Sequence, residues 1–211
     1  MTTAAYVLLA LALVSAIIDW VAVVDDDRKL EYLCKPLTIV LLILTALAID
    51  ADSETVRTWF VAGLVFSLAG DVFLMLKERD LFVLGLASFL LAHLAYVCGF
   101  VASGVSPAHA VLGVAVAAAA VGVVGTRIVN GAHEKAPELA LPVMVYMGVI
   151  SLMLVFAAGS QNGAAILGAL LFYVSDALIG WTRFVQDFKW APLAIMVTYH
   201  LAQTALVWSL S

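Results

Sequence analysis

Charged residues are scarce in this sequence. Only 12% of its 211 residues are Asp, Glu, Lys or Arg, whereas 65% are hydrophobic. An ordinary soluble domain carries about twice that share of charge. The mean hydropathy of +1.12 is too high for a soluble domain of this size, because a small domain still exposes much of its surface. Soluble, disordered, fibrous and nucleic-acid-binding proteins are therefore excluded.

Cysteine is nearly absent as well. Two cysteines are too few for the disulfide framework of a small secreted domain. We expect Cys34 and Cys98 to be unpaired thiols that pack among apolar side chains. The short alternating segments of an outer-membrane barrel are also lacking. The chain has long unbroken apolar runs instead, which are typical of a polytopic α-helical membrane protein.

Eight apolar stretches are candidates for spanning helices. They cover residues 4–24, 36–49, 58–76, 81–102, 108–126, 139–158, 163–182 and 191–210. The second is short, and we expect it to borrow residues 30–35, with the Lys35 side chain reaching the membrane interface. The first lacks the positive segment that precedes a cleavable signal, so we expect it to be a permanent helix. The prediction is an all-α bundle in one domain, residues 1–211.

The basic residues predict the orientation of the bundle. The first, third, fifth and seventh connections hold nine of the ten basic residues, namely Arg28, Lys29, Lys35, Lys77, Arg79, Arg127, Lys135, Arg183 and Lys189. The other connections hold only Arg57. Because cytoplasmic loops are enriched in Lys and Arg, we expect the odd connections to be cytoplasmic and both termini to lie outside. We expect an integral protein of a bacterial plasma membrane.

Two segments resemble each other. Ser-Leu-Ala-Gly-Asp71 in the third stretch parallels Tyr-Val-Ser-Asp176 in the seventh, and the stretch after each contains His-Leu-Ala, at His93 and His200. This pattern fits a parallel duplication of four helices. It also fits chance in a sequence with so few residue types.

Three acids lie inside the predicted spans. A carboxylate in hydrocarbon costs several kcal/mol unless it is paired, protonated or facing a cavity, so each is a functional candidate. A rise of 1.5 Å per residue places Asp19, Asp71 and Asp176 about 9–10 Å inside the cytoplasmic border. Asp71 and Asp176 share depth and local sequence, which favours function. For Asp19, hydration or pairing with a nearby Lys or Arg explains its position equally well.

Other polar residues extend these helix faces. At helical spacing, Ser67 lies with Asp71, Tyr96 with His93, and Gln203 with His200. Such groups could converge on one polar cavity, but a single polar side chain in a membrane helix more often joins helices together. A metal site of two Asp and two His is chemically feasible, yet no His pair at i,i+4 supports one. We expect no metal and no other cofactor.

An ordered set of motifs resembles the YhhN-like family of membrane proteins. The motifs are Lys35-Pro-Leu, Ser67-Leu-Ala-Gly-Asp71-Val-Phe-Leu-Met, Gly85-Leu-Ala-Ser88-Phe-x-x-Ala-His93-x-x-Tyr96, Leu171-Phe-x-x-Ser-Asp176 and Tyr199-His200-x-Ala-Gln203. They run in family order from about residue 30 to the C-terminus. Characterised members are lysoplasmalogenases, which are not known to need an organic cofactor.

The resemblance implies hydrolysis of the vinyl-ether bond of lysoplasmenylethanolamine or lysoplasmenylcholine. The products are a fatty aldehyde and the glycerophospho head group. Such chemistry needs a protonated acid for the β-carbon and a negative group beside the oxocarbenium ion. We assign catalysis to Asp71, Asp176 and His200, with either aspartate as the acid. The expected substrate-binding residues are Lys35, Ser67, Ser88, His93, Tyr96, Tyr199 and Gln203.

Two other functions fit the same residues. Membrane Asp and His also occur in proton-coupled transporters, although many of these show inverted repeats and paired helix breaks that this sequence lacks. The second of these functions is lipid binding without catalysis. The expected partners are a lysophospholipid and membrane lipid, not nucleic acid. The sequence leaves the oligomeric state open.

Overall fold

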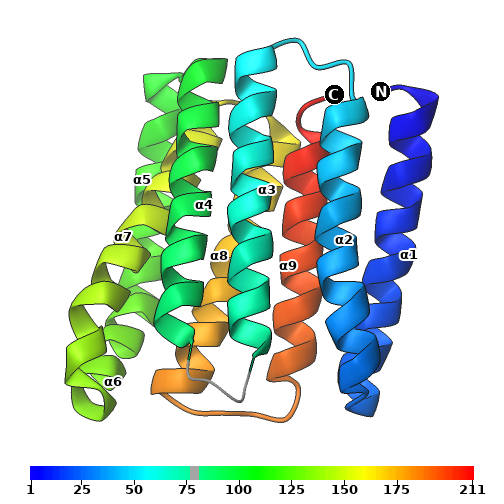
Figure 1. Cartoon of the computed structure of the whole chain (residues 1–211). Helices are drawn as coiled ribbons and strands as arrows, with labels where there is room; N and C mark the ends of the chain where they lie inside the picture. The colour runs from blue at the N-terminus through cyan, green and yellow to red at the C-terminus, as the bar shows by residue number, and fades with distance from the viewer. Residues whose placement is uncertain (77–80) are drawn as a thin grey trace.

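The computed structural model describes residues 1–76 and 81–211, and the described part is helical throughout (Figure 1). The helices are α1 (Thr3–Asp25), α2 (Arg28–Ala48), α3 (Glu54–Met75), α4 (Phe82–Ser103), α5 (Pro107–Ala120), the π-helical turn η1 (Val121–Gly125), α6 (Thr126–Lys135), α7 (Pro137–Gly159), α8 (Gly163–Phe184) and α9 (Ala191–Trp208). Their axes lie side by side and roughly along one line, and consecutive long helices run in opposite directions. The predicted all-α bundle is confirmed.

Local signals fix where the helices begin. The side chains of Thr2, Asp27, Ser53 and Asn162 accept hydrogen bonds from main-chain N–H groups in the first turns of α1, α2, α3 and α8. These bonds satisfy donors that a helix leaves unpaired at its N-terminus. The eight predicted stretches therefore correspond to eight helical segments, with α5, η1 and α6 forming one of them.

Among the described residues, seven helices are long and apolar enough to cross a membrane, with α5 to α6 counted as one segment of 29 residues. The remaining helix, α9, carries polar residues such as Tyr199, His200 and Gln203. All three side chains are buried. The polar content of α9 thus faces other helices rather than lipid.

The structure corrects the prediction for α2. This helix begins at Arg28, where Asp27 caps it, so Pro36 lies inside the helix and not at its start. The Lys35 side chain does not reach the interface: only 5% of the residue is exposed. The fifth connection is shorter than predicted too, because Arg127 and Lys135 belong to α6.

Both chain termini lie at the same end of the bundle, as Figure 1 shows. The α1–α2, α6–α7 and α8–α9 connections lie at the opposite end, where the predicted cytoplasmic basic residues concentrate. Lys77 and Arg79 lie outside the described residues. Which end faces the cytoplasm stays a prediction of the charge pattern.

Helices α3 and α4 pack closely because glycines face aromatic rings. A Cβ atom at Gly63 would lie 2.7 Å from the Tyr96 ring, and one at Gly70 would lie 2.6 Å from the Phe89 ring. Both distances are too short for a side chain to fit unless the ring moves. Small residues let membrane helices approach in this way. The Phe89 ring of α4 therefore packs against Gly70 of α3, the residue that precedes Asp71.

Candidate active site

The three predicted intramembrane acids are all buried, and the bundle gives each a different environment. Exposed fractions are 0% for Asp19, 1% for Asp71 and 9% for Asp176. A buried carboxylate needs a positive partner or hydrogen bonds to offset its lost hydration. The partners found around each acid therefore indicate what that acid can do.

Asp71 belongs to a cluster that we call the Asp71 cluster, formed by Lys35, Asp71 and Tyr199. The Nζ atom of Lys35 lies 3.3 Å from Oδ1 of Asp71. The hydroxyl of Tyr199 donates a hydrogen bond of 2.6 Å to Oδ2. Each carboxylate oxygen thus has a partner, and helices α2, α3 and α9 meet at one ion pair.

Asp176 belongs to a second cluster, the Asp176 cluster, with His93 and Tyr146. Nε2 of His93 lies 2.9 Å from Oδ2 of Asp176 and 2.9 Å from the Tyr146 hydroxyl. That hydroxyl donates a short hydrogen bond to the same Oδ2. The other ring nitrogen of His93 contacts the sulfur of Met153 at 3.2 Å. Every hydrogen bond to Asp176 in this cluster reaches Oδ2, which leaves Oδ1 for a ligand.

Aromatic rings lie between the two clusters. The Phe172 ring packs 5.5 Å from the Tyr199 ring and 4.7 Å from the His93 ring, between centroids. Phe89 also contacts Tyr199, at 5.8 Å. In the described part of the chain, no hydrogen bond joins Asp71 to Asp176. The polar groups that could have converged on one cavity therefore include two separate clusters, with aromatic rings in contact between them.

The pairing crosses between the two halves of the sequence. Asp71 of the first half bonds to Tyr199, which precedes the His-Leu-Ala motif of α9. Asp176 of the second half contacts His93, within the His-Leu-Ala motif of α4. Each acid is thus held by the motif helix of the other half. An internal duplication remains a prediction of the sequence.

The remaining predicted site residues occupy several different positions. Gln203 accepts a 2.6 Å hydrogen bond from the Tyr96 hydroxyl, and this pair joins α9 to α4. Ser67 is fully buried on α3. Ser88 donates to the main-chain oxygen of Leu84 within its own helix, so its hydroxyl contacts neither cluster.

One hydrogen bond joins His200 of α9 to α1, at the residue that follows Asp19. Nδ1 of His200 accepts a 3.1 Å hydrogen bond from the indole N–H of Trp20, the residue after Asp19. Neither carboxyl oxygen of Asp19 has a hydrogen-bond partner among the described residues. No hydrogen bond or ion pair joins Asp19 to a Lys or Arg among the described residues, although the charge of Lys35 acts on its carboxyl. Hydration of Asp19 stays a prediction.

Sequence reasoning missed Trp20 and Tyr146. Both lie in stretches that read as plain apolar spans, outside the motifs. The available signal was general: a tyrosine hydroxyl or indole N–H inside a membrane helix needs a partner. That signal marks a polar contact but does not identify the partner.

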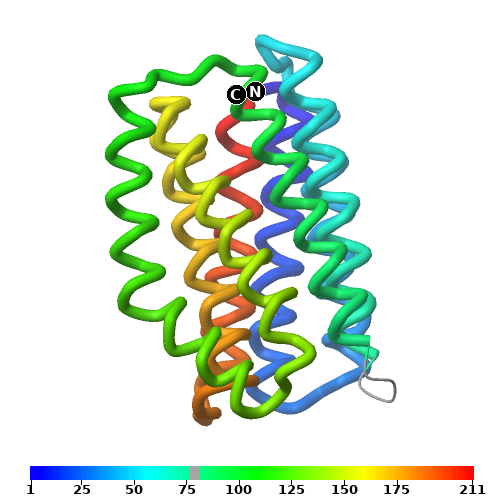
Figure 2. The backbone as a smooth tube through the Cα atoms, turned by 90° about the vertical axis from the view of Figure 1, so that its left-hand side faces the viewer, coloured from blue at the N-terminus to red at the C-terminus, as the bar shows by residue number. Residues whose placement is uncertain are grey.

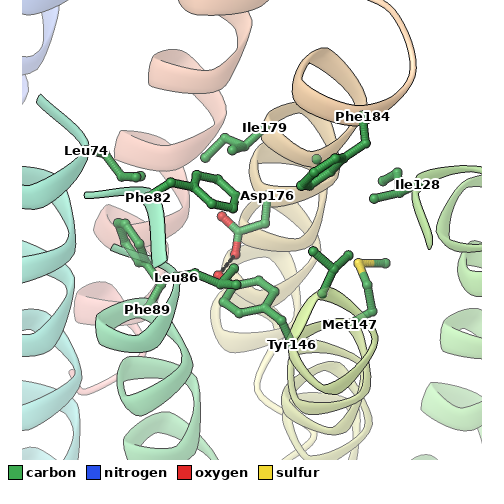
Figure 3. A pocket seen from close by; sticks show the side chains of 12 residues that line it. Leu74, Phe82, Leu86, Phe89, Ile128, Tyr146, Met147, Asp176, Ile179 and Phe184 are labelled. Atoms are coloured by element: carbon green, nitrogen blue, oxygen red, sulfur yellow. Dashed lines mark hydrogen bonds between the residues drawn. The ribbon is translucent and has the colours of Figure 1, made fainter. Parts of the chain in front are cut away.

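A pocket with a volume of about 40 Å³ opens beside Asp176 (Figure 3). Its walls are apolar and include Leu74, Phe82 and Phe89, and the Tyr146 hydroxyl is its other polar group besides Asp176. In Figure 3 the Asp176 carboxyl points into the space between Phe82 and Tyr146. An acid facing an apolar cavity is suited to protonate a weakly basic organic group.

A second cavity of about 430 Å³ lies next to this pocket and is lined by charged residues. Lys35, Arg183, Glu31 and Asp26 line it, and we call it the charged mouth. It shares Leu74, Phe82 and Ile179 with the Asp176 pocket, so the two spaces adjoin. Among residues 1–76 and 81–211, no three His, Cys, Asp or Glu side chains are grouped so that they could hold a metal ion.

Comparisons with known proteins agree on one family. The YhhN family model matches residues 30–210. The human lysoplasmalogenase TMEM86B is 35% identical over 147 residues, 70% of this chain and 61% of the human protein. The mouse protein of the same name is 32% identical over 83% of this chain and 72% of its own length.

A bacterial relative matches as well. The lysoplasmalogenase of Mycobacterium tuberculosis is 30% identical over 76% of this chain and 63% of its own length. No solved structure matches the chain. Because the family model covers nearly the whole sequence, from α2 through α9, this chain belongs to the YhhN family, as its motifs predicted.

Proposed function

We propose that this protein is a lysoplasmalogenase, which hydrolyses the vinyl-ether bond of a lysoplasmenyl phospholipid within the membrane. Three relatives that bear this name align with 70–83% of the chain. The observation that carries the proposal is the Asp176 carboxyl in an apolar pocket that adjoins a charged mouth. A lysophospholipid combines an apolar chain with a charged head in the same way.

The first step is protonation of carbon. The Asp176 carboxyl transfers its proton from Oδ1 to the β-carbon of the vinyl ether, and the ether oxygen then shares the positive charge as an oxocarbenium ion. The Asp176 carboxylate that remains stabilises this cation electrostatically. His93 and Tyr146 hold Oδ2 and so orient the carboxyl.

Water completes the reaction. It adds to the α-carbon and returns a proton to Asp176, which leaves a hemiacetal. The hemiacetal transfers its hydroxyl proton to the glycerol oxygen as the carbon–oxygen bond breaks, giving a fatty aldehyde and the glycerophospho alcohol. One water is consumed and the acid is regenerated.

The Asp71 cluster acts on the head group. Lys35 is held by Asp71 and also lines the charged mouth, so its ammonium is placed to attract the lipid phosphate. Asp71 is then a positioning residue for Lys35. The negative charge of Asp71 also contributes to the electrostatic potential at the site where the oxocarbenium ion forms.

Aldehyde release by the purified protein in detergent tests this function. We expect fatty aldehyde from lysoplasmenylethanolamine and none from the ester-linked lysolipid with the same head group, because hydrolysis of an ester releases a fatty acid and not an aldehyde. Aldehyde can be measured by coupled reduction with a dehydrogenase. A folded, monodisperse protein that releases no aldehyde from either vinyl-ether head-group class would contradict the proposal.

A further inference from the structure

A third cavity lies on the outside of the bundle, between α4 and α7. Its volume is about 320 Å³, and its walls include Val83, Ala87 and Leu90 of α4 with Leu141 and Val145 of α7. We call it the α4–α7 groove. The two helices lie side by side (Figure 2). Every side chain that lines the groove is apolar except Tyr146, whose hydroxyl is bonded within the Asp176 cluster.

The groove adjoins the Asp176 pocket. Leu86 and Tyr146 line both spaces and so form a wall that the two spaces share. The Asp176 pocket in turn shares walls with the charged mouth. Three spaces therefore follow one another: the charged mouth, the Asp176 pocket and the groove.

The outer wall of the groove faces the surroundings of the bundle. The exposed fraction is 63% for Leu141, 51% for Val83 and 49% for Val145. In a helix bundle that spans a membrane, exposed apolar side chains of this kind meet lipid chains. The groove thus faces the hydrocarbon of the bilayer, and Leu86 and Tyr146 separate it from the Asp176 pocket.

The order of the three spaces matches the order of groups in a single-chain ether lipid. Such a lipid has a charged phosphate head, then the glycerol and its vinyl ether, then a long hydrocarbon chain. With the phosphate at Lys35 and Arg183 and the vinyl ether at Asp176, the chain is directed toward the groove.

We infer that the α4–α7 groove holds the hydrocarbon chain of the substrate, and that the lipid enters and its aldehyde leaves sideways through this groove. The inference rests on the proposed function, because it takes the lysolipid as substrate. The groove then sets the chain-length preference, since its length limits how much of the chain can pack against its walls.

A tryptophan in the groove tests this assignment. Ala87 is an exposed groove residue on α4, so Ala87→Trp fills the groove without burying new volume in the core. Because the Trp ring takes the space of the chain, we expect KM for a long-chain substrate to rise about tenfold, which corresponds to about 1.4 kcal/mol. A substrate with a chain too short to reach the groove keeps its wild-type KM.

The matched control is Ala115→Trp, an equally exposed alanine on α5 that lines none of the three spaces. We expect wild-type KM values for both chain lengths. A folded Ala87→Trp protein with an unchanged KM for the long chain would overturn the inference.

Photolabelling of the wild-type protein gives a readout that needs no turnover. The probe is an alkyl-ether lysophosphoethanolamine, which cannot be hydrolysed, with a diazirine at the chain end. We expect crosslinks on residues 83–90 and 141–145 that excess unlabelled probe suppresses. Suppressible crosslinks confined to other helices would overturn the inference. A labelled groove without aldehyde release would contradict the proposed function alone, and aldehyde release without a labelled groove would contradict the inference alone.

Discussion

Replacing Asp176 by Asn is expected to lower the rate of aldehyde release by about 10²–10⁴-fold, the usual contribution of a general acid. An amide cannot donate a proton to carbon, yet it keeps the size and hydrogen-bonding ability of the carboxyl. The introduced amide can still bond to His93 and Tyr146, so the variant keeps its fold. We expect the loss in kcat with little change in KM, because Asp176 acts mainly in the transition state.

The matched control is Asp52→Asn. Asp52 is an exposed acid in the α2–α3 connection, at the end of the bundle where the termini lie. It carries the same change in charge and lines none of the cavities at the candidate site. Steady-state kinetics on both variants make the comparison. Wild-type kcat for a folded Asp176→Asn protein would rule out Asp176 as the acid.

The second large effect concerns stability. Asp71→Asn leaves the Lys35 ammonium buried without its counter-ion, and removing one partner of a buried ion pair costs about 3–5 kcal/mol. We therefore expect a large drop in the midpoint of thermal unfolding in detergent. Activity falls as well, because Lys35 no longer has a fixed position at the charged mouth.

The double variant Lys35→Met with Asp71→Leu separates the two effects. Removing both charges also removes the cost of burying them, so we expect a midpoint near that of the wild type. Lysolipid binding stays weak because the phosphate has lost Lys35. An Asp71→Asn protein as stable as the wild type would show that the ion pair is not part of the folded core.

The number and positions of the helices could be predicted from hydropathy, because each membrane-spanning helix is recognisable from the apolar composition of its own residues. Eight apolar stretches located the helices, and motifs in five of them indicated the family. The burial of Lys35 could not be predicted in this way. A lysine near the end of an apolar stretch has the same local sequence whether it reaches the interface or pairs with Asp71 of another helix.

The separation of the two acids has the same origin. Matched depth along the helices predicted that Asp71 and Asp176 lie at one level, but depth says nothing about the lateral distance between helices. That distance depends on which helices adjoin, and rings such as Phe172 occupy the space between the clusters. Tyr146 was missed because its partners, His93 and Asp176, come from two other helices.

The central claim is that a fixed carboxyl protonates the β-carbon of the vinyl ether. Hydrolysis in D₂O, with the aldehyde reduced to the alcohol as it forms, tests this claim most directly. Because Asp176 approaches the bound chain from one side, the account predicts one deuterium at C2 in a single configuration. A racemic mixture at C2 would contradict the account, since it would mean that an enol leaves the site and takes its proton from water.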